Sequence, residues 1–254
     1  MATQIVLGHG AEFAENPEPR CACLLLLDTS GSMGTIEGGE FQDLGYSCTE
    51  DGQTFRVASG GRTRIGELNG GLQFYKASLT EDPLAAKRVE VSIITFGRRV
   101  ETVCDFTTVD NFVPPILRPE GDTPMGAAIV AGLDAVERRK QSYRANRINY
   151  YRPWVFLLTD GSSTDDCSIA AERLRRLESQ KAIAFFPIGV GAAADMGMLA
   201  GLSNTIPKKL SGLRFRELFQ WLSRSQRSVS NSRAGGEGGS ERVSLPATSN
   251  WEAV

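Results

Sequence analysis

The sequence predicts an α/β domain built on a doubly wound, mostly parallel sheet with one antiparallel edge strand. Residues 21–27 form a near-continuous apolar run closed by Asp28, which is typical of a strand buried on both faces of a parallel sheet. Further apolar strands alternate with amphipathic helices, which favours an open parallel sheet covered by helices on both sides. Residues 89–96 and 100–106 are separated by a tight turn at Gly97, so we expect them to pair in antiparallel fashion.

The remaining elements follow from periodicity and from helix-start signals. Thr123 and Pro124 supply an N-cap and a first-turn proline for a long helix over 124–143. Apolar stripes and buried runs define the others. We expect helices over 65–79, 165–180, 194–202 and 213–227, and strands over 154–158, 183–190 and 206–210.

Three regions are expected along the chain. Residues 1–20 form an N-terminal arm that ends in a proline-rich linker, residues 21–229 form the folded domain, and the Ser- and Gly-rich residues 230–254 form a disordered tail. Trp221 lies off the apolar stripe of the last helix, so we expect it to be partly exposed.

Composition excludes several classes of function. The formal net charge of −2 gives no basic field to attract nucleic acid or a membrane surface, and no apolar run approaches the length of a membrane span. The first ten residues lack the pattern of a secretion signal, and five scattered cysteines do not resemble a disulfide framework, so we expect a cytoplasmic protein. The single histidine, His9, leaves no basis for a catalytic triad or a typical zinc site.

Oxygen-bearing side chains gather where two buried strands end. Asp28, Ser30 and Ser32 follow the first strand, Asp160 follows the strand over 154–158, and Thr123 opens a helix between them. Ligands of open α/β sheets bind beyond the carboxyl ends of the strands, so we expect these five side chains to converge there. Carboxylate and hydroxyl oxygens suit Mg²⁺, with Mn²⁺ or Ca²⁺ as alternatives. Neutral hydroxyls leave much of the ion's charge uncompensated, so a carboxylate from outside is the natural occupant of an open coordination position.

These motifs resemble the metal-ion-dependent adhesion site (MIDAS) of von Willebrand factor A (VWA) domains. The resemblance covers roughly residues 20–230 and implies a Rossmann-like VWA fold, with Asp28, Ser30, Ser32, Thr123 and Asp160 as the five ligand positions, some acting through water. It also implies a non-enzymatic module that binds an Asp or Glu of a protein partner. The competing interpretation, in which Asp28 and Thr123 only cap turns and helices, needs three motifs to fall in this order by chance.

A narrower resemblance is to the bacterial TerY-like VWA proteins linked to tellurite resistance. It is carried by residues 16–20, by residues 155–161 and by residues 218–223. It implies a role in a bacterial stress-response or defence system, with a protein kinase or phosphatase encoded alongside as a candidate partner.

One departure from the family is a long insertion at the metal-site rim, residues 34–63. Two β-prone stretches flank the turn pair Asp51 and Gly52, which predicts a hairpin. The insertion is either a tolerated surface loop or an element that controls access to the metal. In the second case an internal carboxylate could occupy the open coordination position, the candidates being Glu37, Glu40, Asp43, Glu50 and Asp51.

Two other functions compete with the binding module. One is a metal-dependent phosphatase or hydrolase with Asp28 as nucleophile, although Ser30 stands where phosphoaspartyl enzymes of the haloacid dehalogenase type carry a second Asp, and no general base is apparent. The other is a scaffold in which the metal site is structural and the serine-rich tail is the working part. Its candidate phosphorylation sites are Ser228, Ser230, Ser232, Ser240 and Ser244.

Overall fold

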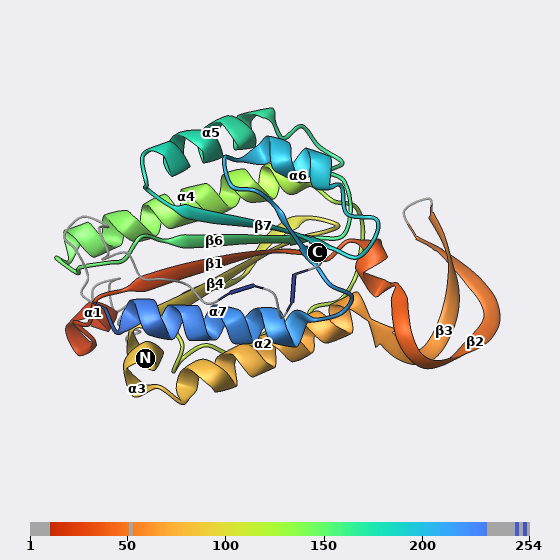
Figure 1. Ribbon diagram of the computed structural model, residues 1–254, viewed down its shortest axis with the longest axis horizontal. Helices are drawn as coiled ribbons and strands as arrows, with labels where there is room; N and C mark the ends of the chain where they lie inside the picture. Colours follow the sequence, from red (N-terminus) through yellow and green to blue (C-terminus); the bar gives the residue numbers. More distant parts are fainter. Residues whose placement is uncertain (1–10, 51–52, 233–246, 249–250, 253–254) are drawn as a thin grey trace, which may run out of the picture.

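The computed structural model describes residues 11–50, 53–232, 247–248 and 251–252. Its centre is a six-stranded sheet in the order β5-β4-β1-β6-β7-β8 (Figure 1). Only β5 runs antiparallel to its neighbour and it lies at one edge, so the predicted fold class is confirmed. The strands are β1 (Cys21–Asp28), β4 (Val89–Phe96), β5 (Val100–Thr108), β6 (Trp154–Thr159), β7 (Ala184–Val190) and β8 (Lys208–Leu210).

Helices cover both faces of this sheet (Figure 1). Successive side chains of a strand point to opposite faces, and β1 shows how each face is filled. Cys23 and Leu25 belong to the core on the side of α2 and α7, whereas Leu24 and Leu26 belong to the core on the side of α4 and α5. The helices are α2 (Arg64–Thr80), α3 (Pro83–Arg88), α4 (Met125–Ala145), α5 (Ser168–Ser179), α6 (Met196–Leu202) and α7 (Phe215–Ser230).

The last helix is buried more deeply than its sequence pattern indicates. Trp221 is only 7% exposed, which corrects the expectation of a partly exposed side chain. The reason is Trp251 from the C-terminal segment, which is 1% exposed and packs edge-on against Trp221 with ring centroids 5.6 Å apart. The backbone carbonyl of Trp251 accepts a hydrogen bond from Ser211, so part of the segment expected to be a disordered tail rests on the domain. Residues 233–246 lie outside the described part of the chain.

The N-terminal arm is also attached to the domain. Its short helix α1 (Ala11–Glu15) places Phe13 in a small apolar cluster with Tyr143. The buried guanidinium of Arg20 then donates to the buried carboxylate of Glu90 over 2.9 Å, and Arg139 pairs with the same carboxylate over 2.8 Å. Buried charges persist only when they are paired and hydrogen-bonded, so this cluster holds the arm against the start of β1.

The insertion forms the predicted hairpin, which is longer than the sequence indicates. After the short 3₁₀ helix η1 (Gly31–Gly34), β2 (Ile36–Glu50) and β3 (Gln53–Thr63) pair as a separate two-stranded sheet that projects from the sheet edge bearing the ends of β1 and β6 (Figure 1). The turn residues Asp51 and Gly52 lie outside the described part of the chain. In the part that is described, no helix is long and apolar enough to cross a bilayer.

Candidate metal centre

Strand register brings the two acidic motifs to one edge of the sheet. Leu27 of β1 lies opposite Leu158 of β6, so the chain leaves both strands at the same level. Asp28 is the last residue of β1, and Asp160 directly follows Thr159, the last residue of β6. The chain passes from β1 to β4 on one side, and β6 lies on the other side. The acidic residues therefore stand where the strand order reverses, which is the usual ligand position of such sheets.

Asp28 is fully buried and held by two hydrogen bonds. Its Oδ1 accepts from the backbone N–H of Ser30 over 2.8 Å, and its Oδ2 accepts from the Thr159 hydroxyl over 2.6 Å. Burial raises the pKa of Asp28 from 3.8 to about 6, and the neighbouring charge of Asp160 adds to the rise, while the bonds from Ser30 and Thr159 oppose it. The site therefore keeps an anion that is costly to bury and gains from a nearby cation.

The serines link this carboxylate to the second one. The turn of η1 brings the Ser30 and Ser32 hydroxyl oxygens to 3.0 Å from each other. The Ser32 hydroxyl donates to Oδ1 of Asp160 over 2.6 Å. Asp28, Ser30, Ser32 and Asp160 are thus joined in one chain of contacts, called here the carboxylate–serine cluster.

Thr123 lies on a loop that packs against residues 29–34, called here the serine loop. The backbone N–H of Gly31 donates to the Gly121 carbonyl over 2.9 Å. Glycine is required at position 121 because φ is +74° there and because a Cβ would lie 2.4 Å from the Arg98 backbone. Thr123 is buried, with only 7% of the residue exposed. Among the hydrogen bonds of the described residues, none joins its hydroxyl to the carboxylate–serine cluster.

The expected capping role of Thr123 is wrong. Pro124 occupies the N-cap position of α4 without a side-chain bond, and Asp165 instead accepts from the backbone N–H groups of Gly126 and Ala127, both over 2.8 Å. Asp165 lies in the loop before α5, which begins at Ser168 rather than at Asp165 as predicted. The Thr123 hydroxyl is therefore not used by the helix that follows it, which leaves it available as a ligand.

Sequence reasoning missed one charged residue of the site, Arg64. Its Nη1 donates to Oδ2 of Asp160 over 2.5 Å, and its Nε donates to Glu37 of the insertion over 2.7 Å. The available signal was position, because Arg64 opens α2 where the chain returns from the insertion to the sheet. The partners lie 27 and 96 residues away along the chain, so no local pattern could indicate them.

The donor set suits a hard divalent ion. Two carboxylates and the hydroxyls of two serines are present in the cluster, with the Thr123 hydroxyl on the adjoining loop, and oxygen ligands of this kind are those that Mg²⁺, Mn²⁺ and Ca²⁺ prefer. Within the described residues no group of three or more His, Cys, Asp or Glu side chains could hold a metal. A metal at this edge would therefore depend on the serine hydroxyls as well as on the acids.

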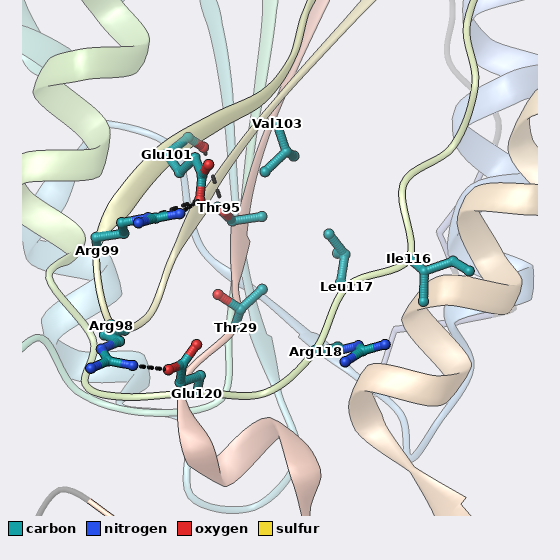
Figure 2. Close-up of a pocket in the computed structure, with 10 residues that line it drawn as sticks. All are labelled: Thr29, Thr95, Arg98, Arg99, Glu101, Val103, Ile116, Leu117, Arg118 and Glu120. Carbon is teal, nitrogen blue, oxygen red and sulfur yellow. Dashed lines mark hydrogen bonds and ion pairs between the residues drawn. The ribbon is translucent and has the colours of Figure 1, made fainter.

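Two hollows adjoin the serine loop. Figure 2 shows the first, about 420 Å³, between the β4–β5 turn and residues 116–120, with Thr29 on its wall and Arg98 paired to Glu120 over 2.5 Å. The second, about 540 Å³, lies between the hairpin and the serine loop and is lined by both, including Gly31 and Phe41. The serine loop thus has a hollow on each of two sides.

Comparison with known proteins identifies the family to which the chain belongs. The family model of the von Willebrand factor type A domain matches residues 72–211, more than half of the chain, so the chain belongs to this family. The matched stretch contains Thr123 and Asp160 and begins after the serine motif, from which the insertion separates it.

Individual relatives are distant. The human collagen alpha-6(VI) chain is 36% identical over 99 residues, which is 39% of this chain and only 4% of that protein. Among solved structures, the pilus adhesin SpaC from Lactobacillus rhamnosus GG has a TM-score of 0.54 at 11% identity, covering 82% of this chain and 31% of that one. A mutant of the PilB minor pilin from Streptococcus sanguinis has a TM-score of 0.53 at 13% identity, covering 84% and 63%. These likenesses show the shared fold.

Proposed function

We propose that this chain is a metal-dependent protein-binding module that holds an Asp or Glu of a partner at a MIDAS site. The carboxylate–serine cluster carries the proposal, because it gathers at the strand ends the hard oxygens that a divalent ion needs. Asp28, Ser30, Ser32, Thr123 and Asp160 are the proposed ligands, Mg²⁺ is the proposed ion, and Mn²⁺ and Ca²⁺ are the alternatives. The serine and threonine hydroxyls are neutral ligands, so the carboxylate of a partner can occupy an open coordination position of the ion.

The binding role is favoured over a phosphatase by the state of Asp28. Both of its oxygens already accept hydrogen bonds and the residue is 0% exposed, so its carboxylate is poorly placed to attack a phosphate ester. A phosphatase assay with Mg²⁺ and a generic aryl phosphate tests this alternative directly. We expect no turnover above that of Asp28→Ala.

The scaffold alternative loses one of its phosphorylation sites. Ser230 is fully buried at the end of α7, and its hydroxyl donates to the Arg227 carbonyl over 3.1 Å. A kinase could not reach it in the folded domain. The serines at 240 and 244 lie outside the described residues.

The narrower TerY-like assignment, with a bacterial stress-response role and a kinase or phosphatase partner, is a proposal from residue stretches only. A cytoplasmic location is a separate proposal, from the scattered cysteines and the first ten residues. One of the TerY-like stretches has a structural role here. The guanidinium of Arg20 donates to the Glu18 carbonyl and to the Asn16 carbonyl, so residues 16–20 are held in place by the buried arginine.

The test is a pull-down from lysate of the source cells in Mg²⁺ and in EDTA. Wild type, Asp28→Ala and Asp134→Ala are compared, the last being a matched control because Asp134 is a half-exposed aspartate on α4 that pairs with Arg173 away from the cluster. We expect a protein retained in Mg²⁺ by wild type and by Asp134→Ala, and lost in EDTA or with Asp28→Ala. Equal retention by all three proteins in both Mg²⁺ and EDTA would contradict metal-dependent capture.

A further inference from the structure

Arg64 bridges the carboxylate–serine cluster and the insertion. Arg64 is only 7% exposed, and its Nη1 donates to Oδ2 of Asp160 over 2.5 Å. Both Nε and Nη2 face Oε1 of Glu37, the Nε bond being 2.7 Å long. The guanidinium of Arg64 therefore joins Asp160, a proposed metal ligand, to Glu37, a carboxylate of the insertion.

The surroundings fix this arrangement. Arg64 is the first residue of α2, whose N-cap Thr63 accepts from the Gly66 N–H over 3.1 Å, and the helix is anchored in the core by Leu68. Gly191, at the end of β7, lies so close that a Cβ there would be 2.8 Å from Nη2 of Arg64 and 3.0 Å from Oε1 of Glu37. The ion pair is thus packed into a space that has no room for a side chain at that position.

The charge of Arg64 is permanent. Burial opposes it, but the hydrogen bonds to Glu37 and Asp160 outweigh burial and hold the pKa of Arg64 above its ordinary value. A guanidinium beside Asp160 already neutralises one of the two carboxylates on which a divalent ion depends. An incoming ion must either share Asp160 with this cation or separate the two, and both cost binding free energy.

Glu37 acts in the opposite direction. Its carboxylate takes two of the three guanidinium nitrogens, so it attracts Arg64 away from Asp160 and returns a negative charge to the neighbourhood of the site. Asp43, another carboxylate of the insertion, pairs instead with Arg56 over 2.7 Å within the hairpin. Of the insertion's described carboxylates, Glu37 is the one joined to the metal centre.

We propose that Arg64 is a built-in cation of the metal centre that competes with the divalent ion for Asp160, and that Glu37 weakens this competition. This inference rests on the proposed metal site, and it identifies the two residues that set the affinity of that site for the divalent ion. The insertion then tunes the affinity of the metal centre through the charge of Glu37.

The test is calorimetric titration of the purified full chain with Mn²⁺. Arg64→Met keeps the length of the side chain and removes its charge, so the dissociation constant should fall about tenfold or more, as expected when a charged hydrogen-bond competitor is removed. Glu37→Gln should raise the dissociation constant by about threefold or more, because Arg64 is left with Asp160 as its one anionic partner.

The chain offers a matched control pair in the same segment. Arg62 and Glu67 form an exposed ion pair over 2.7 Å that does not touch Asp160. Arg62→Met and Glu67→Gln should leave Mn²⁺ affinity within about twofold of wild type, as surface pairs contribute little. A general loss of positive charge would instead tighten binding in Arg62→Met as much as in Arg64→Met, and would overturn the proposal.

A double-mutant cycle separates this account from one in which Glu37 ligates the metal. If Glu37 acts through Arg64, Glu37→Gln should change affinity little in the Arg64→Met background. If Glu37 is itself a ligand, its loss should weaken binding equally in both backgrounds, and the proposal is wrong.

The remaining outcomes are also decisive. Wild type and Arg64→Met binding Mn²⁺ with equal affinity would refute the competition while leaving the metal site intact. Absence of Mn²⁺ binding in every variant would refute the metal site and this inference together. Urea unfolding of each variant in EDTA shows whether it is folded. If Arg64→Met does not fold, Glu37→Gln carries the test, and an Mn²⁺ affinity equal to that of wild type in this variant would refute the proposal.

Discussion

Asp28 should destabilise the metal-free domain near neutral pH, and Asp28→Asn should relieve this. Burial raises the pKa of Asp28 from 3.8 to about 6, so folding favours the protonated form. Stability linked to Asp28 is therefore fully present below about pH 4 and is lost as the pH rises through about 6. A shift of about two pKa units corresponds to about 3 kcal/mol above pH 6. An Asn at this position is neutral at every pH and escapes that penalty.

Part of this gain is offset. The carboxylate accepts from Ser30 and from Thr159, and an amide has a single oxygen, so one of the two bonds must rearrange at a cost of about 1 kcal/mol. The net expectation in EDTA at pH 7.5 is that Asp28→Asn is more stable than wild type by about 2 kcal/mol. At pH 4 the difference should vanish or change sign.

The assay is urea unfolding in EDTA between pH 4 and pH 7.5, with Asp134→Asn on α4 as the half-exposed control. With saturating Mg²⁺ the order at pH 7.5 should reverse, because only wild type gains stability from the bound ion. A variant that is less stable than wild type by the same amount at every pH would refute the reasoning, since Asp28 would then be a purely structural hydrogen-bond acceptor.

Three further predictions follow from the same geometry. Mn²⁺ affinity measured by calorimetry should fall between pH 7.5 and pH 5, because protons compete for Asp28 below its pKa of about 6, and a flat profile would contradict its role as a ligand. EDTA should leave the far-ultraviolet circular dichroism spectrum unchanged, since both halves of the core are complete without the ion, whereas unfolding would mark the metal as structural. Trp251→Ala should lower the free energy of unfolding by about 3 kcal/mol, because it empties the space against Trp221, and an unchanged urea midpoint would show that the C-terminal contact does not form in solution.

The fold could be predicted because its central strands are apolar on both faces. A run such as residues 21–27 is typical of a strand covered by helices on both sides, and its closing Asp28 marks the end at which ligands bind. The antiparallel edge pair followed from Gly97 between two β-prone stretches. The short helices α1 and α3 were not predicted, because five or six residues are too few to show a helical period.

Only those parts of the candidate site that follow from the order of strands and motifs along the chain could be predicted. Asp28, Ser30, Ser32 and Asp160 were expected together because parallel strands end at a common edge, and the structure brings these four into contact. Thr123 lies on the adjoining loop, but its expected capping role belongs to Asp165, which no local signal separated from the start of the next helix.

Contacts made across long separations could not be read from the sequence. The position of Arg64 depends on how a 30-residue insertion returns to the sheet, and its partner Asp160 is 96 residues away. Trp221 was misjudged for the same reason, because the side chain that covers it comes from the C-terminal segment. In both cases a tertiary contact, and not the local pattern, decides the environment.

The central claim is that a divalent ion binds at the carboxylate–serine cluster. The most direct measurement is anomalous scattering from crystals of this chain grown with Mn²⁺. The account predicts one strong peak at coordination distance from the Ser30 and Ser32 hydroxyls, next to Asp28 and Asp160, and its loss in crystals of Asp28→Ala. A peak elsewhere on the molecule, or an empty cluster at saturating Mn²⁺, would contradict it.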